Sequence, residues 1–296
     1  MRTDMSVGYL RHIQACNMPV DEPFLPWLGA GHQLGWVRPI IAQHLQDYPQ
    51  VFSFENGISL QPHLREFDQI SAGLAEVAQG LARDGVISPL IDEPYPVTPG
   101  GREAAIAVVD RAAAAYLGLR SFGQHLNGYL RDGEDILMWI GRRAQDRRIF
   151  PGALDNMVAG GLPYGVSLVE NLVKECQEEA GMPRELAEKA KPVGALSYNR
   201  VAERGFRPDV LYCYDIELPR DFRPLNTDGE VEEFMLMPIA EVMDIVRNSD
   251  QFKFNCNLVI VDFLVRHGLI GPEHEEYLAI ASGLRAPSGP PRSRQT

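Results

Sequence analysis

The clearest periodic pattern of the chain lies in its first third, where apolar residues recur at steps of three and four. This spacing places apolar side chains on one face of a helix, which Gly85 would end. Before the helix, the apolar runs 50–55 and 58–60 flank Asn56-Gly57, a dipeptide that favours a tight hairpin turn. The residues that carry the helical pattern are Leu64, Phe67, Ile70, Leu74, Val77 and Leu81.

An alanine-rich segment after a proline-rich loop is expected to form a second helix, over residues 102–117. With the hairpin and the first helix, it predicts a separate α+β domain over residues 1–120. Nothing in this domain indicates chemistry, because its histidines show no spacing typical of metal ligands. Three roles remain open for it: selecting a substrate, covering a sheet, or forming a homodimer.

From residue 121 the helical spacing gives way to strand-like apolar runs. A helix over 257–267, apolar nearly all round, is expected to cover the sheet that these strands form. The elements predict a second, α/β domain over 121–285, followed by a disordered tail over 286–296. The expected strands span 125–130, 135–140, 209–218 and 230–237.

Within this second domain, a glycine-rich loop precedes a helix with three acidic residues on one face. Ser167 suits the N-cap of the helix, and Gly181 suits its C-terminal cap, where φ is positive. Glu175, Glu178 and Glu179 stand at i, i+3 and i+4, so their carboxylates repel one another. A divalent cation that prefers oxygen ligands would relieve this repulsion. The alternative is an acidic surface patch that is merely solvated.

Composition narrows the classes of partner. The formal net charge of −12 argues against nucleic acid, whose phosphates are held by basic patches. No apolar run approaches the roughly 20 residues that span a bilayer, and the N-terminus lacks a secretory pattern. The four cysteines show no CxxC spacing, which favours reduced thiols and a cytoplasmic protein. We therefore expect a small-molecule partner, with neither nucleic acid nor membrane.

Four arginines are concentrated after the second strand of this domain, in an otherwise acidic chain. A guanidinium group matches the geometry of phosphate oxygens, so some of these side chains are candidates for binding substrate phosphates. The alternative is that they only offset the net negative charge. The four residues are Arg142, Arg143, Arg147 and Arg148.

The glycine-rich loop, the acidic helix and its terminal glycine resemble the Nudix hydrolase signature, G-x5-E-x7-R-E-U-x-E-E-x-G-U, where U is bulky and apolar. The chain reads Gly160-x5-Val166-x7-Lys174-Glu175-Cys176-x-Glu178-Glu179-x-Gly181-Met182, without a gap. Two positions depart from the pattern, because Val166 replaces a glutamate and Lys174 replaces an arginine. In the family these two residues brace the loop against the helix. Their joint change indicates the compensated loss of one ion pair.

Further segments resemble one Nudix subfamily, whose members carry an N-terminal domain and are fused in some organisms to a thiamine diphosphokinase. The resemblance implies an α/β/α sandwich with a mixed sheet, preceded by a smaller α+β domain. It also implies hydrolysis of thiamine diphosphate, or its oxidised analogues, to the monophosphate. The segments are 125–129, 151–156, 197–199, 228–232 and 266–268.

The resemblance also assigns roles to residues, with Mg²⁺ or Mn²⁺ as cofactor. It implies Glu175 and Glu179 as metal ligands, helped by the backbone carbonyl of Ala159. Glu178 would bind a further ion or position the attacking water. For the general base, the family's pattern points to a later loop or strand. The candidates there are Glu230, Glu232 and Glu233, with Glu230 favoured because it lies at the loop edge.

Substrate binding is assigned to Arg142, Arg143, Arg147, Lys174 and Tyr198. Tyr198, like Trp139 and Phe254, could stack on a planar heterocycle, although an aromatic residue is more often part of a core.

Two alternative functions stay open at this stage. One is hydrolysis of a nucleoside diphosphate derivative such as ADP-ribose. The other is a non-catalytic Nudix module that senses a diphosphate, which the replacement of a signature glutamate by Val166 keeps under consideration.

Overall fold

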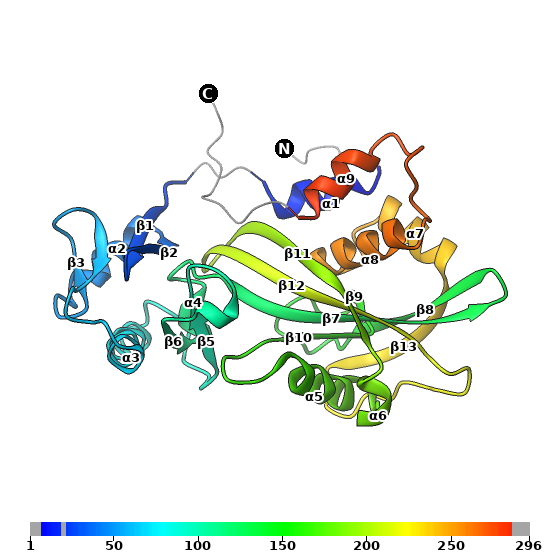
Figure 1. The fold of residues 1–296 in the computed structure, drawn as a ribbon, viewed down its shortest axis with the longest axis horizontal. Coiled ribbons are helices and arrows are strands. Elements are labelled where there is room, and N and C mark those ends of the chain that lie inside the picture. The colour runs from blue at the N-terminus through cyan, green and yellow to red at the C-terminus, as the bar shows by residue number, and fades with distance from the viewer. Residues whose placement is uncertain (1–6, 19–21, 286–296) are drawn as a thin grey trace.

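The larger part of the chain is built on one mixed sheet. It is seen in a computed structural model, which describes residues 7–18 and 22–285 (Figure 1). The strands of this sheet are Ser121–Asp132 (β7), Asp135–Arg143 (β8), Leu154–Asn156 (β9), Val158–Gly161 (β10), Lys191–Ala202 (β11), Gly205–Glu217 (β12) and Val231–Pro238 (β13). The order β11-β12-β7-β8-β13 forms the main path, with β10 also paired to β7 and β9 to β8. The β12–β7 pair is parallel, and the other pairs are antiparallel.

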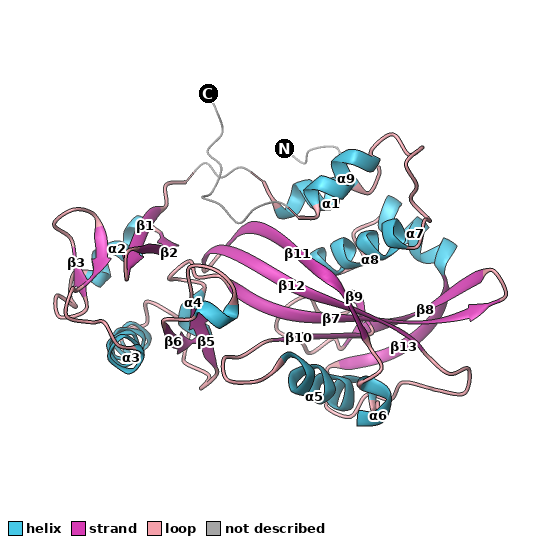
Figure 2. Ribbon diagram, viewed as in Figure 1, coloured by secondary structure: helices cyan, strands magenta, loops and turns pink. Residues whose placement is uncertain are grey.

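Helices cover both faces of the sheet (Figure 2). One face carries α5 and α6, and the other carries α7 and α8, with α1 and α9 on the outside. This layering confirms the expected α/β class with a mixed sheet between helices. The helices span Leu10–Cys16 (α1), Leu168–Ala180 (α5), Arg184–Ala187 (α6), Ile239–Asn248 (α7), Phe254–Arg266 (α8) and Tyr277–Gly283 (α9).

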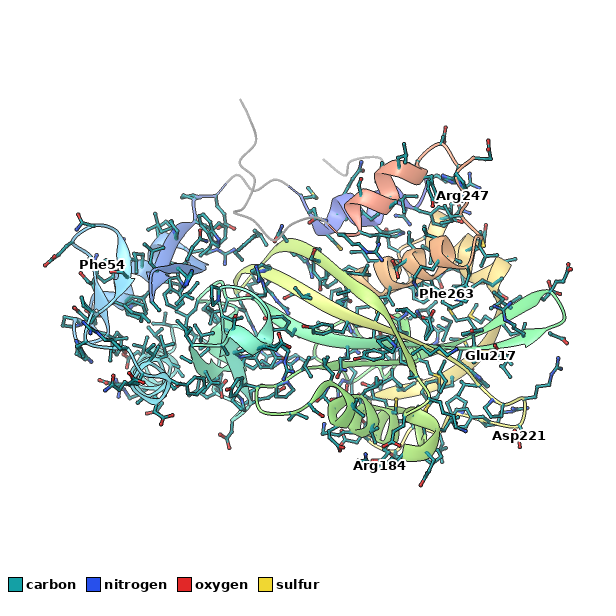
Figure 3. All side chains as sticks on the ribbon, in the orientation of Figure 1. Phe54, Arg184, Glu217, Asp221, Arg247 and Phe263 are labelled. Atoms are coloured by element: carbon teal, nitrogen blue, oxygen red, sulfur yellow. The ribbon has the colours of Figure 1, made fainter. Side chains whose placement is uncertain are left out.

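Each face of the sheet has its own hydrophobic core. On one face, Leu258 and Phe263 of α8 pack with Met138 of β8 in the larger core. On the other, Leu172 and Cys176 of α5 pack in a smaller core with strand residues such as Leu126. Figure 3 shows side chains filling the space between the layers, with Phe263 on α8 above the sheet.

The acidic helix α5 forms as its caps predict. The hydroxyl of Ser167 accepts a hydrogen bond from the backbone N–H of Glu170 at 3.1 Å. Gly181 ends the helix in the left-handed region, at φ 59°, where a glycine avoids steric strain. The helix over 257–267 is also confirmed, as α8, and Arg266 Nε lies 2.6 Å from Asp262 Oδ2 one turn away.

The N-terminal part has a four-stranded sheet, a two-stranded ribbon and its own core, in which Trp27 and Leu74 are fully buried. The strand order is β2-β1-β4-β3, and β5 pairs with β6. Phe54, in the β3–β4 hairpin, lies at the far end of the molecule (Figure 3). Its elements are Leu25–Gly29 (β1), His32–Val37 (β2), Pro39–Leu45 (α2), Phe52–Ser53 (β3), Ile58–Leu60 (β4), Phe67–Arg83 (α3), Pro94–Val97 (β5), Arg102–Ala104 (a 3₁₀ turn), Ala107–Asp110 (β6) and Arg111–Ala114 (α4).

Two expectations for this part are confirmed and one is wrong. The hairpin forms, with Phe52 opposite Leu60, and α3 is the predicted amphipathic helix, followed by Gly85 at φ 71°. The predicted helix over 102–117 does not form. Instead β6 interrupts it, because Val109 pairs with Tyr95 of β5 and both are buried. Pairing and burial outweigh the helix propensity of the alanines here.

The first helix packs against the larger part rather than with the N-terminal sheet. Ile13 and Cys16 of α1 belong to the core around α8. The ring Nε2 of His12 also bonds the carbonyl of Val246 in α7 at 2.6 Å. The tail over 286–296 lies outside the described residues.

Candidate active site

One cleft of about 960 Å³ collects most of the chemically interesting side chains. Its lining comes from β7, β10, α5, the β11–β12 hairpin, the loop after β8 and the start of α8. Residues of the N-terminal part, on β5 and α4, complete it. The cleft is therefore shared by both parts of the chain.

The three carboxylates of α5 line this cleft in different environments. Glu179 is 7% exposed, and its Oε2 accepts a hydrogen bond from the N–H of Ala159 at 2.8 Å. Burial raises the pKa of Glu179 to about 8, which means that a nearby positive charge would stabilise its ionised form. Burial also raises the pKa of Glu175.

A glycine at position 160 lets β10 approach this carboxylate pair. A Cβ there would lie 2.4 Å from the carboxyl carbon of Glu175, closer than real atoms approach. The Glu175 side chain therefore lies directly against the backbone of β10 at Gly160, and a Cβ there would require this side chain to shift.

Lys174 supplies the nearest positive charge to two of the three glutamates. Its Nζ lies 2.9 Å from Glu178 Oε2 and 3.4 Å from Glu175 Oε1. The hydrogen bond to Glu178 raises the pKa of Lys174. The ammonium group thus balances part of the acidic face from its exposed side, whereas it forms no ion pair with Glu179 among the described residues.

Arginines gather on the opposite walls of the cleft. Within the part that the structure describes, Arg148, Arg200 and Arg204 line the cleft without forming an ion pair. The guanidinium of Arg200 lies 4.0 Å from the ring centroid of Phe254, a cation–π contact. Arg147, by contrast, is bound to Glu230 at 2.8 Å.

The N-terminal part adds Tyr95 and Arg111 to the lining. Arg111 Nη1 lies 2.9 Å from Glu93 Oε2, and its guanidinium carbon lies 5.3 Å from the Tyr95 ring centroid. A Cβ on Gly161 would lie 2.6 Å from the Tyr95 hydroxyl and 3.1 Å from Arg111 Nη1. Both side chains therefore sit directly against the strand that ends in the glycine-rich loop.

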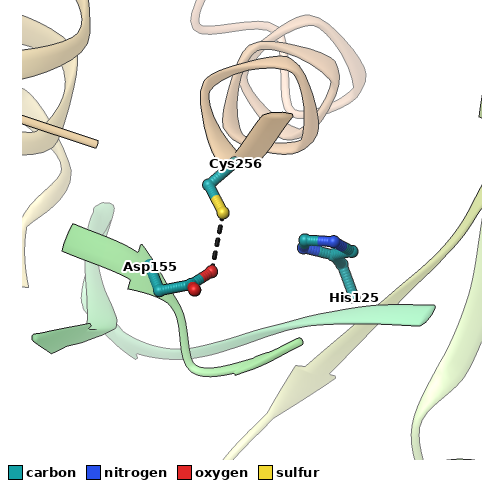
Figure 4. A group of neighbouring side chains, drawn as sticks. All are labelled: His125, Asp155 and Cys256. Atoms are coloured by element: carbon teal, nitrogen blue, oxygen red, sulfur yellow. Dashed lines mark hydrogen bonds between the residues drawn. The ribbon is translucent and has the colours of Figure 1, made fainter. Parts of the chain in front are cut away.

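Beneath the cleft lies a buried cluster of His125, Asp155 and Cys256 (Figure 4). Their potential ligand atoms lie within 4.8 Å of one another, the one such group of His, Cys, Asp or Glu among the described residues. The Cys256 thiol donates a hydrogen bond to Asp155 Oδ1 at 2.6 Å.

Charge balance argues against a metal ion in this buried cluster. Asp155 Oδ2 already lies 3.1 Å from both Arg143 Nη1 and Lys253 Nζ. Burial holds the pKa of the Cys256 thiol well above its usual value, so the thiolate that a metal requires is disfavoured. A further cation would meet two existing ones, and the His125 ring is already bonded through Nδ1 to Asn156 Oδ1 at 2.8 Å.

Comparison with known proteins places this geometry in a family. A model described as "NUDIX domain" matches residues 126–258, and one described as "Domain of unknown function (DUF4743)" matches residues 8–121. "Nudix hydrolase 24, chloroplastic" of Arabidopsis thaliana is 42% identical over 284 residues, which cover 94% of this chain and 78% of the relative. The chain belongs to the Nudix hydrolase family. It is accordingly an enzyme of the hydrolase class.

A second plant relative agrees with this assignment. "Nudix hydrolase 20, chloroplastic" of the same plant is 40% identical over 291 residues, 94% of this chain and 78% of the relative. Among solved structures, a MutT protein from Methanosarcina mazei Go1 is 14% identical, with a TM-score of 0.38 over 49% of this chain and 92% of that one. The family assignment rests on the two plant hydrolases.

The structure brings most of the sequence-predicted residues of this Nudix hydrolase together. The cleft is lined by Ala159, Lys174, Glu175, Glu178, Glu179, Arg143, Arg147, Tyr198 and Glu230. Tyr198 is 1% exposed and its hydroxyl donates to Asp209 Oδ2 at 3.0 Å, so little of its ring is free to stack on a ligand. Arg143 is engaged by the buried Asp155, as described above.

Four of the sequence-predicted candidates lie outside the cleft: Arg142, Glu232, Glu233 and the stacking candidate Trp139. Glu233, on β13, is exposed and lies 3.7 Å from Arg142, on the neighbouring strand β8. The bulge in β13 aligns this pair across the two strands, away from α5. Glu233 and Arg142 are therefore left out of the site proposed below.

Sequence reasoning missed several lining residues. Tyr95 lies in the proline-rich loop and Arg111 in the segment 102–117 expected to be helical. Both belong to the part expected to carry no chemistry, and only the tertiary fold brings them to the cleft. Arg200, Arg204 and Arg207 did leave a signal, since their concentration in one hairpin resembles that of the arginines at 142–148. Lys253 left none, because a lone lysine before a helix is unremarkable.

The residues of α5 fit a divalent cation. The structure leaves Glu179 buried, with a raised pKa and a single hydrogen bond from Ala159. Among the described residues Glu179 forms no ion pair, and a hard cation bound through oxygen ligands would supply a direct positive partner. Glu175 lies on the same side of the helix, against Gly160.

Proposed function

We propose that this Nudix hydrolase is a Mg²⁺- or Mn²⁺-dependent diphosphatase that converts thiamine diphosphate, or its oxidised analogues, to the monophosphate. The observation that carries the proposal is the convergence on one cleft of the carboxylates of α5 and of arginines for which the described residues supply no ion pair. Acidic side chains suit a metal and arginines suit phosphate, so a metal-bound diphosphate matches both.

In this proposal Glu175 and Glu179 hold the cation, together with the backbone carbonyl of Ala159, and Glu178 is placed to hold a further ion or the water. When bound, the cation screens the charge of the diphosphate and makes a bound water more acidic. Lys174, which pairs with Glu178 and Glu175, would share the balancing of these carboxylates with the cation. The N–H of Ala159 keeps the Glu179 carboxylate oriented.

Glu230 is the proposed general base. It lines the cleft at the start of β13, and its Oε1 lies 2.8 Å from Arg147 Nη2. Binding of a phosphate by Arg147 would release Glu230 to accept a proton from the attacking water. Arg147 and Glu230 thus form a pair that the substrate separates.

The arginines also bear on the organic half of the substrate. A thiazolium ring is a permanent cation, and where it lies beside Arg148, Arg200 and Arg204, rather than beside the acidic residues of the same cleft, these arginines would repel it. The neutral ring of an oxidised analogue avoids this cost while keeping the same diphosphate. Phe254 also lines the cleft, and the guanidinium of Arg200 lies over its ring at 4.0 Å, so a neutral ring would have to displace Arg200 or stack on the guanidinium itself. We therefore propose that oxidised analogues are preferred over thiamine diphosphate itself.

Phosphate release from a panel of diphosphates tests the proposal. Thiamine diphosphate, an oxothiamine diphosphate and ADP-ribose are each incubated with the full chain, with and without Mg²⁺. We expect metal-dependent turnover, with the highest kcat/KM on the oxothiamine compound. Preference for ADP-ribose would instead assign a nucleoside diphosphate derivative. Ligand binding without turnover of any compound would favour the sensor.

A further inference from the structure

The signature loop, residues 162–167 between β10 and α5, is anchored at its two ends by the larger part of the chain. Before the loop, the carbonyl of Gly161 accepts a bond from Asn171 Nδ2 at 2.9 Å. After it, the carbonyl of Leu168 accepts one from Gln124 Nε2 at 2.8 Å. The N–H of Leu162 donates to the carbonyl of Phe122 at 3.0 Å.

The middle of the loop is held by the N-terminal part instead. Arg102, in the 3₁₀ turn between β5 and β6, donates from Nη2 to the carbonyl of Pro163 at 2.7 Å and to that of Val166 at 2.8 Å. One guanidinium therefore ties together two carbonyls three residues apart and fixes the curvature of the loop. Bonds from a charged donor are stronger than neutral ones.

Tyr164 adds two further contacts to the same part of the chain. Its N–H donates to the carbonyl of Pro94, at the start of β5, at 2.7 Å. Its ring lies 5.4 Å from that of Phe67, at the start of α3. Hydrogen bonds and ring contact thus come from three separate elements of the N-terminal part, so the contact is an extended interface.

Among the described residues, no side chain of the larger part bonds the carbonyl of Pro163 or Val166. Val166 has no polar group, and the ammonium of Lys174 is directed to Glu178 and Glu175. We propose that Arg102 is a positioning residue of the Nudix site. It holds the signature loop in the curvature that sets β10 against α5, so the N-terminal part belongs to the catalytic apparatus.

The route from the loop to the carboxylates is short. The loop connects Gly161, at the end of β10, to the first turn of α5, and across these elements Ala159 bonds Glu179 at 2.8 Å. A looser loop would let β10 and α5 shift against each other. Since misplacement by about 1 Å can cost two orders of magnitude in rate, the effect should exceed that of a lost surface contact.

The test compares variants of the full chain. Arg102→Ala removes both bonds, Arg102→Lys keeps one cationic donor, and Tyr164→Ala removes only the exposed ring contact with Phe67. Arg83→Ala is the matched control, because Arg83 is an exposed arginine of the same part that contacts Asp84 at 3.2 Å. Activity is measured on whichever diphosphate the wild type hydrolyses fastest, so the identity of the substrate is not at issue.

Two readouts do not depend on turnover. Hydrogen exchange follows the amide of Tyr164, and titration with Mn²⁺ gives the affinity for the cation. For Arg102→Ala we expect exchange at Tyr164 to accelerate at least about tenfold, weaker Mn²⁺ binding, and kcat lower by about tenfold or more with little change in KM. Arg102→Lys should recover part of each loss, and Arg83→Ala should match the wild type.

Wild-type kcat and Mn²⁺ affinity in a folded Arg102→Ala protein would overturn the proposal. If Arg102→Ala loses activity and Mn²⁺ binding and its Tm also falls strongly, the proposal is judged on Arg102→Lys and Tyr164→Ala instead. Lower kcat and faster exchange in those variants, at unchanged Tm, would support the proposal. Unchanged values in both would overturn it.

Discussion

At the scale of single residues, Glu179 concentrates the chemistry of the site. It is the most buried carboxylate of α5 and the one whose oxygen is fixed by the backbone of β10. A buried, oriented carboxylate is pre-organised for a cation and costly to keep ionised without one. Replacing Glu179 therefore tests whether the acidic face of α5 is a metal site or a solvated acidic patch.

Glu179→Gln should abolish most of the activity without unfolding the protein. The amide keeps the shape and can still accept the bond from Ala159, but it carries no charge for a cation. We expect kcat to fall by at least about 10²–10³-fold at unchanged Tm below pH 5. Glu134→Gln, in the β7–β8 turn, is the matched control. Activity of Glu179→Gln within about tenfold of wild type would remove Glu179 from the metal role.

The same residue predicts a pH dependence of stability in the metal-free protein. With a pKa near 8 in the folded state and about 4.5 when unfolded, Glu179 binds more protons in the folded state between these values. Stability should therefore fall as pH rises from about 5 to 8. At pH 8, Glu179→Gln should be more stable than wild type by roughly 2–4 kcal/mol. If the free energies of unfolding of the two proteins changed with pH in the same way across this range, the prediction would be contradicted.

At the scale of elements, sequence patterns predicted the helices whose signals lie in neighbouring residues of the chain. Short stretches of the sequence contain all the signals for two helices: the caps and acidic face of α5, and the apolar surface of α8. Both helices form. The segment 102–117 was misjudged because pairing of Val109 with Tyr95 is a tertiary event. For the same reason the contributions of Arg102 and Arg111 to the site could not be read from their neighbours in the sequence.

Val166 and Lys174 depart from the signature, and we expect the protein to tolerate a double substitution that restores the family's residues at both positions. Val166→Glu with Lys174→Arg returns the pair found in the family pattern, and Arg102 binds the backbone carbonyl of residue 166, which the change leaves in place. We expect kcat/KM of the double variant to stay within about tenfold of wild type. Loss of all activity in a folded protein would show that the two changes are not a compensated exchange.

At the scale of the whole molecule, the cleft is the product of both parts of the chain. Tyr95 and Arg111 reach it from the N-terminal part, and Arg102 holds the loop at its edge. No helix among residues 7–18 and 22–285 is long and apolar enough to cross a membrane. Because both parts line the cleft, we expect them to act as one unit on a small diphosphate.

Arg111→Ala tests this shared cleft at the substrate. Arg111 is the guanidinium of the N-terminal part that lies against Gly161, and we expect it to bind a phosphate oxygen. Its loss should raise KM about tenfold, with a smaller effect on kcat. Arg83→Ala serves as control here too. An unchanged KM would restrict the substrate to the larger part of the chain.

The location of the cation tests the central claim most directly. Crystals of the full chain are soaked with Mn²⁺ and a non-hydrolysable diphosphate, and the anomalous signal is mapped. The account predicts an ion bound by Glu175 and Glu179 beside the carbonyl of Ala159. An ion at His125, Asp155 and Cys256 instead, or an empty face of α5 with Lys174 still paired to Glu178, would contradict it.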